Sequence, residues 1–151
     1  MKTKLAVFFL LYVVCNSAYS QSGWINKSFA SPNTMLYDNF FIDSMVGFTV
    51  GSTGNILKTT DSGEHWISVN AGTSYSLVSV FFTDINTGWA VGSQNTIYKT
   101  TNSGVSWFQQ LSITFGNWNS VFFLDPQRGW CVGGGLTQTI IYTSNGGANW
   151  Q

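Results

Sequence analysis

The sequence predicts an all-β protein built from four-stranded antiparallel units, on the basis of its composition and of an internal repeat. Aromatic residues make up 17% of the 151 residues and charged residues only 8%. Valine, phenylalanine, tryptophan and threonine, which favour strands, are common, and 16 glycines allow tight turns. The chain also repeats with a period of about 41 residues. Four short strands in a repeat of about 40–45 residues are typical of one blade of a β-propeller.

Three sequence blocks each occur three times, in the same order and mostly in steps of 41 residues. The blocks occupy 39–43, 80–84 and 121–125, then 47–51, 88–92 and 129–133, and finally 59–66, 100–107 and 143–150. The last step of the third block is 43 residues, because two extra residues fall in a glycine-rich hairpin between 133 and 143. An insertion is easily accommodated in a turn, so the exception fits the repeat.

Four strands are expected in each repeat, and the second repeat shows them in order. Residues 77–83 are apolar and rich in β-branched and aromatic side chains, and a turn over 84–88 leads to a strand at 89–92. A second turn over 93–95 leads to strands at 96–101 and 106–111. The turn between these last two strands carries the motif Thr-x-Asp/Asn-x-Gly-x-x-Trp.

We predict that this motif is structural. Its Asp or Asn side chain can accept hydrogen bonds from the backbone of its own turn, its glycine can adopt a positive φ, and its tryptophan can pack between sheets. Calcium binding would require a cluster of carboxylates, but two of the three copies carry a neutral Asn. The motif residues are Thr59, Asp61, Gly63, Trp66, Thr100, Asn102, Gly104, Trp107, Thr143, Asn145, Gly147 and Trp150.

At these residues the chain resembles the Asp-box (BNR) repeat family, and within it the photosystem II stability/assembly factor-like propellers. The resemblance covers about residues 24–151 and implies a partial β-propeller with blades at about 24–65, 66–106 and 107–149. Propellers typically have about 4–8 blades, so we expect a fragment of a longer protein with six or seven blades. The alternative is a ring closed by several copies of the chain, which associate through open blade edges.

The N-terminal 20 residues have the pattern of a signal peptide. Lys2 and Lys4 precede an apolar run over 5–14, and the small residues Ala18 and Ser20 precede a cleavage site before Gln21. The run is shorter than the ~20 apolar residues that span a bilayer, so no membrane span is expected after removal of 1–20. We therefore expect an exported protein in a periplasmic, lumenal or extracellular compartment.

Few residues are suited to catalysis or to binding a cofactor. A sialidase site needs several arginines to hold the substrate carboxylate, and Arg128 is the only one. His65 is the only histidine, and Cys131 has no recognisable catalytic partner, so we expect no catalytic, cofactor or metal site. Basic and acidic residues balance at six each, which gives no basic surface for nucleic acid.

The resemblance implies a binding or assembly function without enzymatic activity, with a protein or a glycan as partner. The alternative is the N-terminal fragment of a secreted Asp-box glycoside hydrolase whose catalytic residues lie outside this chain. Tyr75, Phe115 and Trp118, in the long connections 68–76 and 112–119, are candidates for a binding surface. For Phe115 and Trp118 the alternative is packing against a neighbouring blade.

Overall fold

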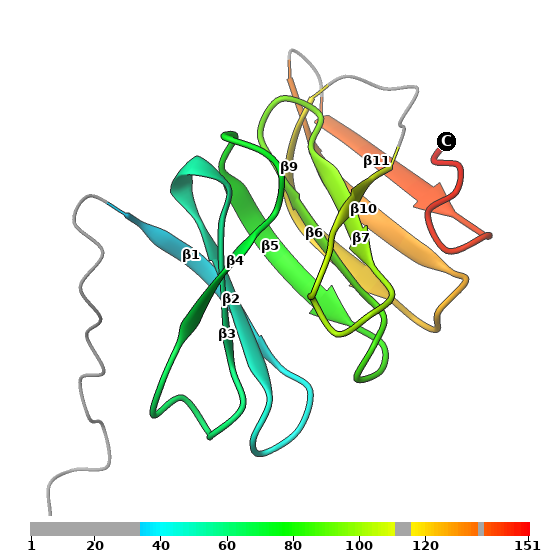
Figure 1. Cartoon of the computed structure of the whole chain (residues 1–151). Helices are drawn as coiled ribbons and strands as arrows, with labels where there is room; N and C mark the ends of the chain where they lie inside the picture. The colour runs from blue at the N-terminus through cyan, green and yellow to red at the C-terminus, as the bar shows by residue number, and fades with distance from the viewer. Residues whose placement is uncertain (1–33, 111–115, 136–137) are drawn as a thin grey trace, which may run out of the picture.

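A computed structural model describes residues 34–110, 116–135 and 138–151, which form three antiparallel sheets and no α-helix (Figure 1). The predicted signal peptide and Phe115 lie outside these residues. The strands are β1 (Leu36–Phe41), β2 (Gly47–Gly51), β3 (Asn55–Thr59), β4 (Ile67–Asn70), β5 (Leu77–Phe82), β6 (Gly88–Gly92), β7 (Ile97–Thr100), β8 (Phe108–Gln109), β9 (Asn117–Phe123), β10 (Gly129–Gly134) and β11 (Gln138–Thr143).

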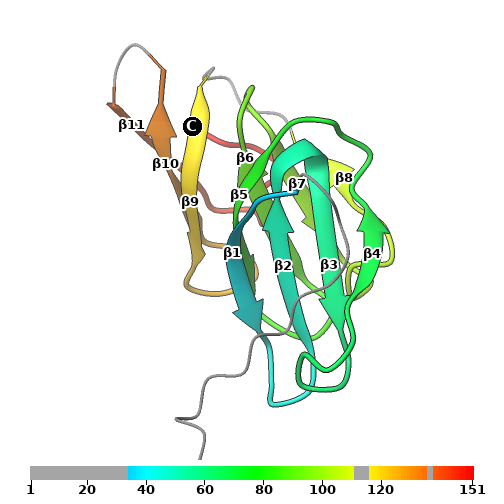
Figure 2. The ribbon, with the colours of Figure 1, turned by 90° about the vertical axis from the view of Figure 1, so that its left-hand side faces the viewer.

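Each sheet is one propeller blade whose strands follow one another in chain order. The first blade contains β1 to β4, the second β5 to β8, and the third β9 to β11. The backbone of Gln151 pairs with that of Tyr142 in β11, at the position where a fourth strand begins in the other two blades. β1, β5 and β9 lie side by side, one from each blade, and the blades extend away from them (Figure 2). The predicted all-β fold of antiparallel propeller blades is confirmed, and the propeller is incomplete.

The sheets group the strands differently from the blades expected at 24–65, 66–106 and 107–149. The strand that follows the motif tryptophan of the first repeat, β4, pairs with β3, with Ile67 opposite Lys58. β8 likewise pairs with β7, so the first two sheets cover 36–70 and 77–109. The physical reason is local, because the motif forms a tight turn that reverses the chain and returns it along the strand just completed.

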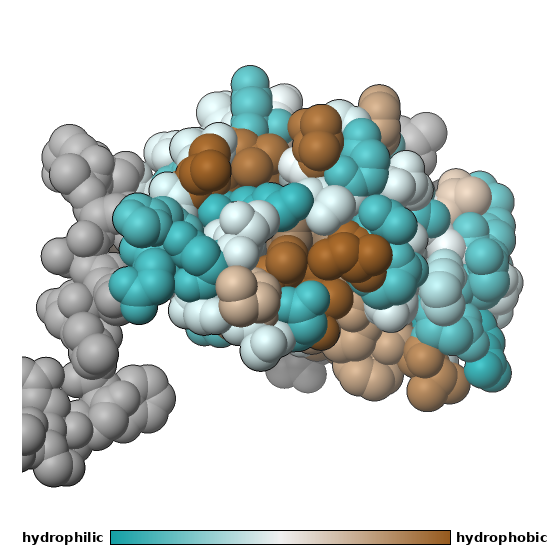
Figure 3. All heavy atoms as spheres, turned by 60° about the horizontal axis from the view of Figure 1, so that its bottom comes forward, coloured by the Kyte–Doolittle hydropathy of each residue, from teal (hydrophilic) through white to brown (hydrophobic). Residues whose placement is uncertain are grey.

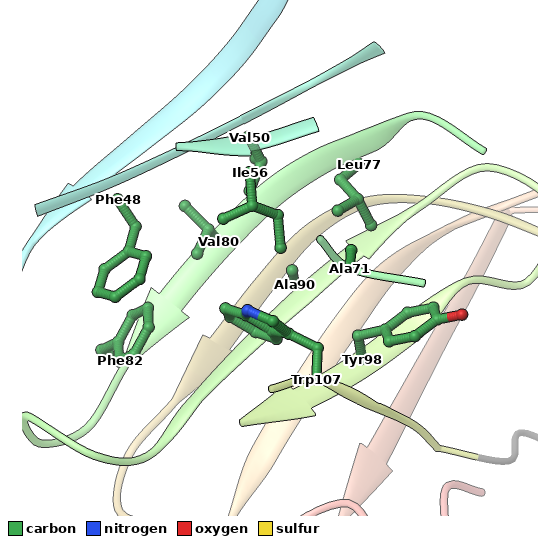
Figure 4. Packing of buried hydrophobic residues seen from close by; sticks show 10 residues of the cluster. All are labelled: Phe48, Val50, Ile56, Ala71, Leu77, Val80, Phe82, Ala90, Tyr98 and Trp107. Carbon is green, nitrogen blue, oxygen red and sulfur yellow. The ribbon is translucent and has the colours of Figure 1, made fainter. Parts of the chain in front are cut away.

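The core lies between the blades, where each sheet packs against the next. We call the side of a blade that faces the preceding blade its leading face, and the side that faces the following blade its trailing face. The trailing face of the first blade presents Phe48, Val50 and Ile56, all 0% exposed. Figure 4 shows them packed against the leading face of the second blade, formed by Leu77, Val80, Phe82, Ala90, Tyr98 and Trp107.

The second junction repeats the first. The trailing face of the second blade presents Trp89, Val91 and Ile97, again 0% exposed. The leading face of the third blade covers them with Trp118, Val121, Phe123, Cys131, Ile141 and Trp150. β6 is therefore buried along its whole length, because one side faces the first blade and the other side the third.

Hydrogen bonds also cross the junctions at equivalent positions. Lys58 Nζ donates to the backbone oxygen of Ser103 at 2.7 Å, and Lys99 Nζ donates to that of Gly146 at 2.8 Å. In both cases a lysine of one blade binds the Asp-box turn of the next. Among the first strands, the Asp38 carboxylate accepts from the backbone N–H of Val80 at 3.0 Å.

Candidate binding surface

The Asp boxes form three nearly identical turns at one end of the blades. In the first, the Thr59 hydroxyl donates to Asp61 Oδ1 at 2.8 Å and accepts from the Gly63 N–H at 2.9 Å. Asp61 Oδ1 also accepts from the His65 N–H at 2.9 Å. The second and third boxes repeat these bonds around Thr100 and Asn102 and around Thr143 and Asn145. Because a single side-chain oxygen accepts these bonds, Asn serves as well as Asp.

The three motif tryptophans lie against the aromatic residue that closes the first strand of their own blade. Trp66 meets the ring of Phe41 edge-on at 6.0 Å between centroids, and Trp107 meets Phe82 in the same way at 6.0 Å. Trp150 lies edge-on to Phe123 at 5.8 Å, so all three junction sides are built alike. The Asp-box residues thus close a turn, and Trp107 and Trp150 also fill the core between the blades, whereas Trp66 is half-buried.

A second set of acidic residues occupies the first turn of each blade, at the same end. Asp43 Oδ1 accepts from two backbone N–H groups at 2.7 Å, and Asp84 and Asp125 accept from the corresponding pairs in their own turns. These hydrogen bonds hold the pKa of Asp43 below its ordinary value. At Asp125 the Arg128 guanidinium, 2.7 Å away, is the largest cause of a lowered pKa. All three carboxylates therefore stabilise turns in their charged form.

Figure 3 views the molecule from this end, where apolar side chains gather in patches between polar ones. The exposed apolar residues in these turns include Met45, Ile85, Val105 and Leu124. They come from different turns of the three blades.

Two polar hollows lie at the opposite end, one where the β4–β5 connection meets the β2–β3 turn and the other where it meets β7 and β8. One has a volume of about 430 Å³ and is lined by Thr34, Thr53, Gly54, Asn55, Ser68, Val69, Asn70 and Thr73. The other has a volume of about 280 Å³ and is lined by Gly72, Thr73, Ser74, Tyr75, Thr96, Tyr98 and Gln109. Thr73 lines both, so the two hollows are neighbours. We call them together the polar face.

The residues predicted for a binding surface have different positions in the structure. Tyr75 is 51% exposed and lines the smaller hollow. Trp118 is 0% exposed and packs in the core between the second and third blades. For this residue the alternative interpretation, packing against a neighbouring blade, is therefore the right one, and Trp118 does not belong to a binding surface. Its indole N–H donates to the Asn95 side chain at 3.2 Å. The 41-residue register, which equates Trp118 with the buried Leu77, is a signal that could have placed it in the core.

Sequence reasoning missed Thr73, Tyr98 and Gln109, which line the smaller hollow with Tyr75. Tyr98 lies on β7, and its ring is buried in the core while its hydroxyl reaches the backbone oxygen of Gly72 at 3.4 Å. Only the packing of the first blade against the second brings β7 and β8 beside the β4–β5 connection. No local motif therefore marks these residues.

Other chemistry finds little support in the part of the chain that the structure covers. Within 34–110, 116–135 and 138–151, no three His, Cys, Asp or Glu side chains meet in a group that could hold a metal ion. Burial raises the pKa of the Cys131 thiol, which disfavours the nucleophilic thiolate. In the same ranges the structure has no helix long and apolar enough to cross a membrane.

The repeated sheets and their Asp-box turns define the chain as part of an Asp-box β-propeller. A family model described as photosynthesis system II assembly factor YCF48 matches residues 16–114, more than half of the sequence. The chain therefore belongs to the YCF48 family, and the resemblance seen in the sequence is confirmed. No curated protein matches the sequence.

Solved structures support the same relationship. YCF48 bound to a D1 peptide is similar with 28% identity and a TM-score of 0.69, and YCF48 from Cyanidioschyzon merolae with 26% identity and a TM-score of 0.68. Each comparison covers 78% of this chain and 39% of the YCF48 chain, so this chain spans about two fifths of their length. The GH74 enzyme of Niastella koreensis, at 17% identity and a TM-score of 0.63, covers 77% of this chain and 22% of its own, and shows the shared fold alone.

Proposed function

We propose that this chain is an exported, non-enzymatic protein-binding module of the assembly-factor type, and that its polar face binds an extended segment of a partner protein. The observation that carries the proposal is the pair of neighbouring hollows beside the exposed ring of Tyr75. The similar YCF48 structure bound to a D1 peptide supports a polypeptide as the kind of partner.

The chemistry of the polar face suits a peptide. Its lining consists mainly of hydroxyl, amide and backbone groups, with two tyrosines and Val69, and the residues that line the two hollows include no charged side chain. Hydroxyl and amide groups can both donate and accept hydrogen bonds, as the backbone of an extended peptide requires. An exposed tyrosine adds a rigid apolar surface with little loss of conformational entropy on binding.

A binding measurement with defined probes tests this proposal. The purified chain is used to pan a phage-displayed library of random peptides, and the D1 peptide is measured beside the selected peptides by fluorescence anisotropy. We expect Tyr75→Ala to weaken peptide binding at least about tenfold, which corresponds to ~1.4 kcal/mol. Tyr37→Ala is the matched control, because Tyr37 is 47% exposed but lines neither hollow.

Four results would contradict the proposal. One is the enrichment of no peptide, and another is an equal effect of the two tyrosine variants. A third is the hydrolysis of a polysaccharide by the purified chain that is lost on replacing a single carboxylate, which would favour a glycoside hydrolase. Binding of a glycan array in place of peptides would favour a glycan partner and would likewise overturn the proposed peptide.

Export is tested separately, because it depends on the N-terminal residues alone. We expect the chain expressed in a secreting bacterial host to be recovered outside the cytoplasm, with Gln21 as its first residue. N-terminal sequencing of the recovered protein measures this directly. Recovery in the cytoplasm with Met1 intact would contradict export without bearing on peptide binding.

A further inference from the structure

The β6–β7 turn of the second blade is hydrogen-bonded to the connection that leads into the third blade. The Gln94 N–H donates to the side-chain oxygen of Asn117 at 3.0 Å, and the Asn95 N–H donates to the backbone oxygen of Gly116 at 2.7 Å. The indole N–H of Trp118 donates to the side-chain oxygen of Asn95 at 3.2 Å. Three polar groups of this turn are therefore satisfied by the chain itself.

The equivalent turn of the first blade lines the larger hollow of the polar face and lacks these bonds. Thr53 occupies the repeat position of Gln94, and the two backbones have the same left-handed conformation, with φ of 57° and 56°. Ser76 stands at the position of Asn117. Within residues 34–110, 116–135 and 138–151, neither the Thr53 N–H nor the Ser76 hydroxyl has a hydrogen-bond partner. The first blade thus exposes an N–H group that the second blade binds with an amide oxygen.

The neighbouring positions of the first blade do not supply the missing groups either. Gly54 stands where the second blade has Asn95, and a Cβ atom there would lie 2.0 Å from the backbone oxygen of Thr73. Leu77 stands where the third blade has Trp118, and its buried side chain has no N–H to donate. The two turns therefore share a backbone conformation but differ in the side chains placed against them.

Two more polar side chains of the larger hollow are available to a ligand. Asn55 on β3 and Ser68 on β4 both line it, and in the part of the chain that the structure describes neither side chain has a hydrogen-bond partner. A primary amide both donates and accepts, so the Asn55 carboxamide can pair with a second amide through two hydrogen bonds. The residues that line this hollow carry no charge, so a charged ligand group would lose water without gaining an opposite charge. A neutral amide fits this set of groups.

We propose that the larger hollow binds an amide side chain, Asn or Gln, of the partner segment. The amide oxygen of the partner accepts from the Thr53 N–H, as the Asn117 oxygen accepts from the Gln94 N–H in the second blade. The amide nitrogen of the partner donates to the Asn55 carboxamide. This specificity rests on the proposed peptide binding and names the residue that the partner segment must supply.

A single substitution fills the site with a side chain of the protein itself. Ser76→Asn restores the residue found at the second junction, and the introduced amide should accept from the Thr53 N–H. We expect the melting temperature to rise by about 2–4 °C, as for one added hydrogen bond. The affinity for the selected peptides should fall at least about tenfold, because a peptide must displace the new side chain. Ser44→Asn is the matched control, since Ser44 is exposed in the β1–β2 turn at the other end.

The peptides themselves provide the second measurement. Those selected on the natural chain should share an Asn or Gln, and its replacement by Asp or Glu should weaken binding at least about tenfold. The same replacement should matter less for an Asn55→Ala chain, which has lost the partner of the amide nitrogen. Peptides that bind equally well in the amide and acid forms overturn the amide site but leave peptide binding intact. A Ser76→Asn chain that melts and binds like the natural chain, or a Ser44→Asn chain that changes as much, also overturns the amide site. If no peptide binds at all, the proposed function fails and the amide site fails with it.

Discussion

Replacing Trp89 with alanine is expected to be among the most destabilising single changes in this chain. The indole is 0% exposed between the second and third blades and stacks on Phe123 at 3.5 Å between ring centroids. Its N–H donates to the backbone oxygen of Gly146 at 3.3 Å, and Lys99 Nζ lies 5.1 Å from its ring centroid. One side chain therefore contributes apolar burial, ring stacking and a hydrogen bond to the same junction.

The magnitude follows from the buried area. A buried aromatic side chain removes about 150–250 Å² from water, which at ~25 cal/mol per Å² amounts to about 4–6 kcal/mol. This is an upper estimate, because the unfolded chain already hides part of the surface, and substitutions of buried Phe or Trp by Ala typically cost about 3–5 kcal/mol. At about 2–4 °C per kcal/mol for a chain of this size, the melting temperature should fall by about 6–20 °C.

Thermal unfolding followed by circular dichroism measures this change, with Trp130→Ala as the matched control. Trp130 occupies the same repeat position but is 38% exposed, so its loss should cost clearly less. Trp89→Phe should be tolerated best, because the first blade already has Phe48 at this position and the change keeps most of the apolar volume. Equal losses for Trp89→Ala and Trp130→Ala would refute the packing of the third blade against the second.

Three further predictions concern the turns and the buried thiol. Asp61→Asn should keep the turn folded, because the other two boxes use Asn, but it should lower the melting temperature slightly at neutral pH, because it removes a stability that is fully present above about pH 4 and lost as the pH falls towards the Asp61 pKa of about 2. Gly104→Ala should destabilise more than Gly72→Ala, since both glycines have a positive φ near +75° but only at Gly104 would the new methyl group meet the ring of Phe48. Cys131 should react with thiol reagents only after unfolding, because it is buried and its pKa is raised.

Each of these has a measurement that would contradict it. The Asp61 prediction is measured by acid unfolding followed by circular dichroism. The largest causes of the lowered Asp61 pKa are the hydrogen bonds from the His65 backbone and side chain. An Asp61→Asn variant that unfolds in acid like the natural chain would show that this carboxylate is unimportant. Equal melting temperatures for the two glycine variants would refute the contact with Phe48, and rapid labelling of the folded protein would refute burial of Cys131.

The repeat in the sequence predicted much of the fold because residues at equivalent repeat positions form the same turns and the same hydrogen bonds. Once Thr59, Asp61 and Gly63 are recognised as one turn, the second and third turns follow from the period, and the structure shows the same hydrogen bonds in each. The two extra residues near 133–143 fall between β10 and β11, away from the conserved register of the strands. Turns that depend on a few neighbouring side chains and recur at a fixed interval can therefore be recognised from one sequence alone.

The arrangement of the strands and of the candidate site depended on contacts that no local pattern shows. Whether a strand such as Ile67–Asn70 completes one sheet or begins the next is decided by pairing across a turn, and the sequence is compatible with both. Tyr98 reaches the polar face only because the sheets pack against each other, and Lys58 is recognisable as a junction residue only once Ser103 lies beside it. The sequence also did not show which aromatic residues are exposed. Trp118 and Tyr75 both lie near turns, but Trp118 is buried and Tyr75 is on the surface.

The likeness of the two junctions has a consequence for how such a chain can evolve. A duplicated or deleted repeat brings with it both of the surfaces that it needs, so a gene can gain or lose a whole repeat in frame without inventing a new contact. Selection at one junction, such as the pairing of Phe48 with Phe82 or of Trp89 with Phe123, can therefore proceed independently of how many repeats the gene contains.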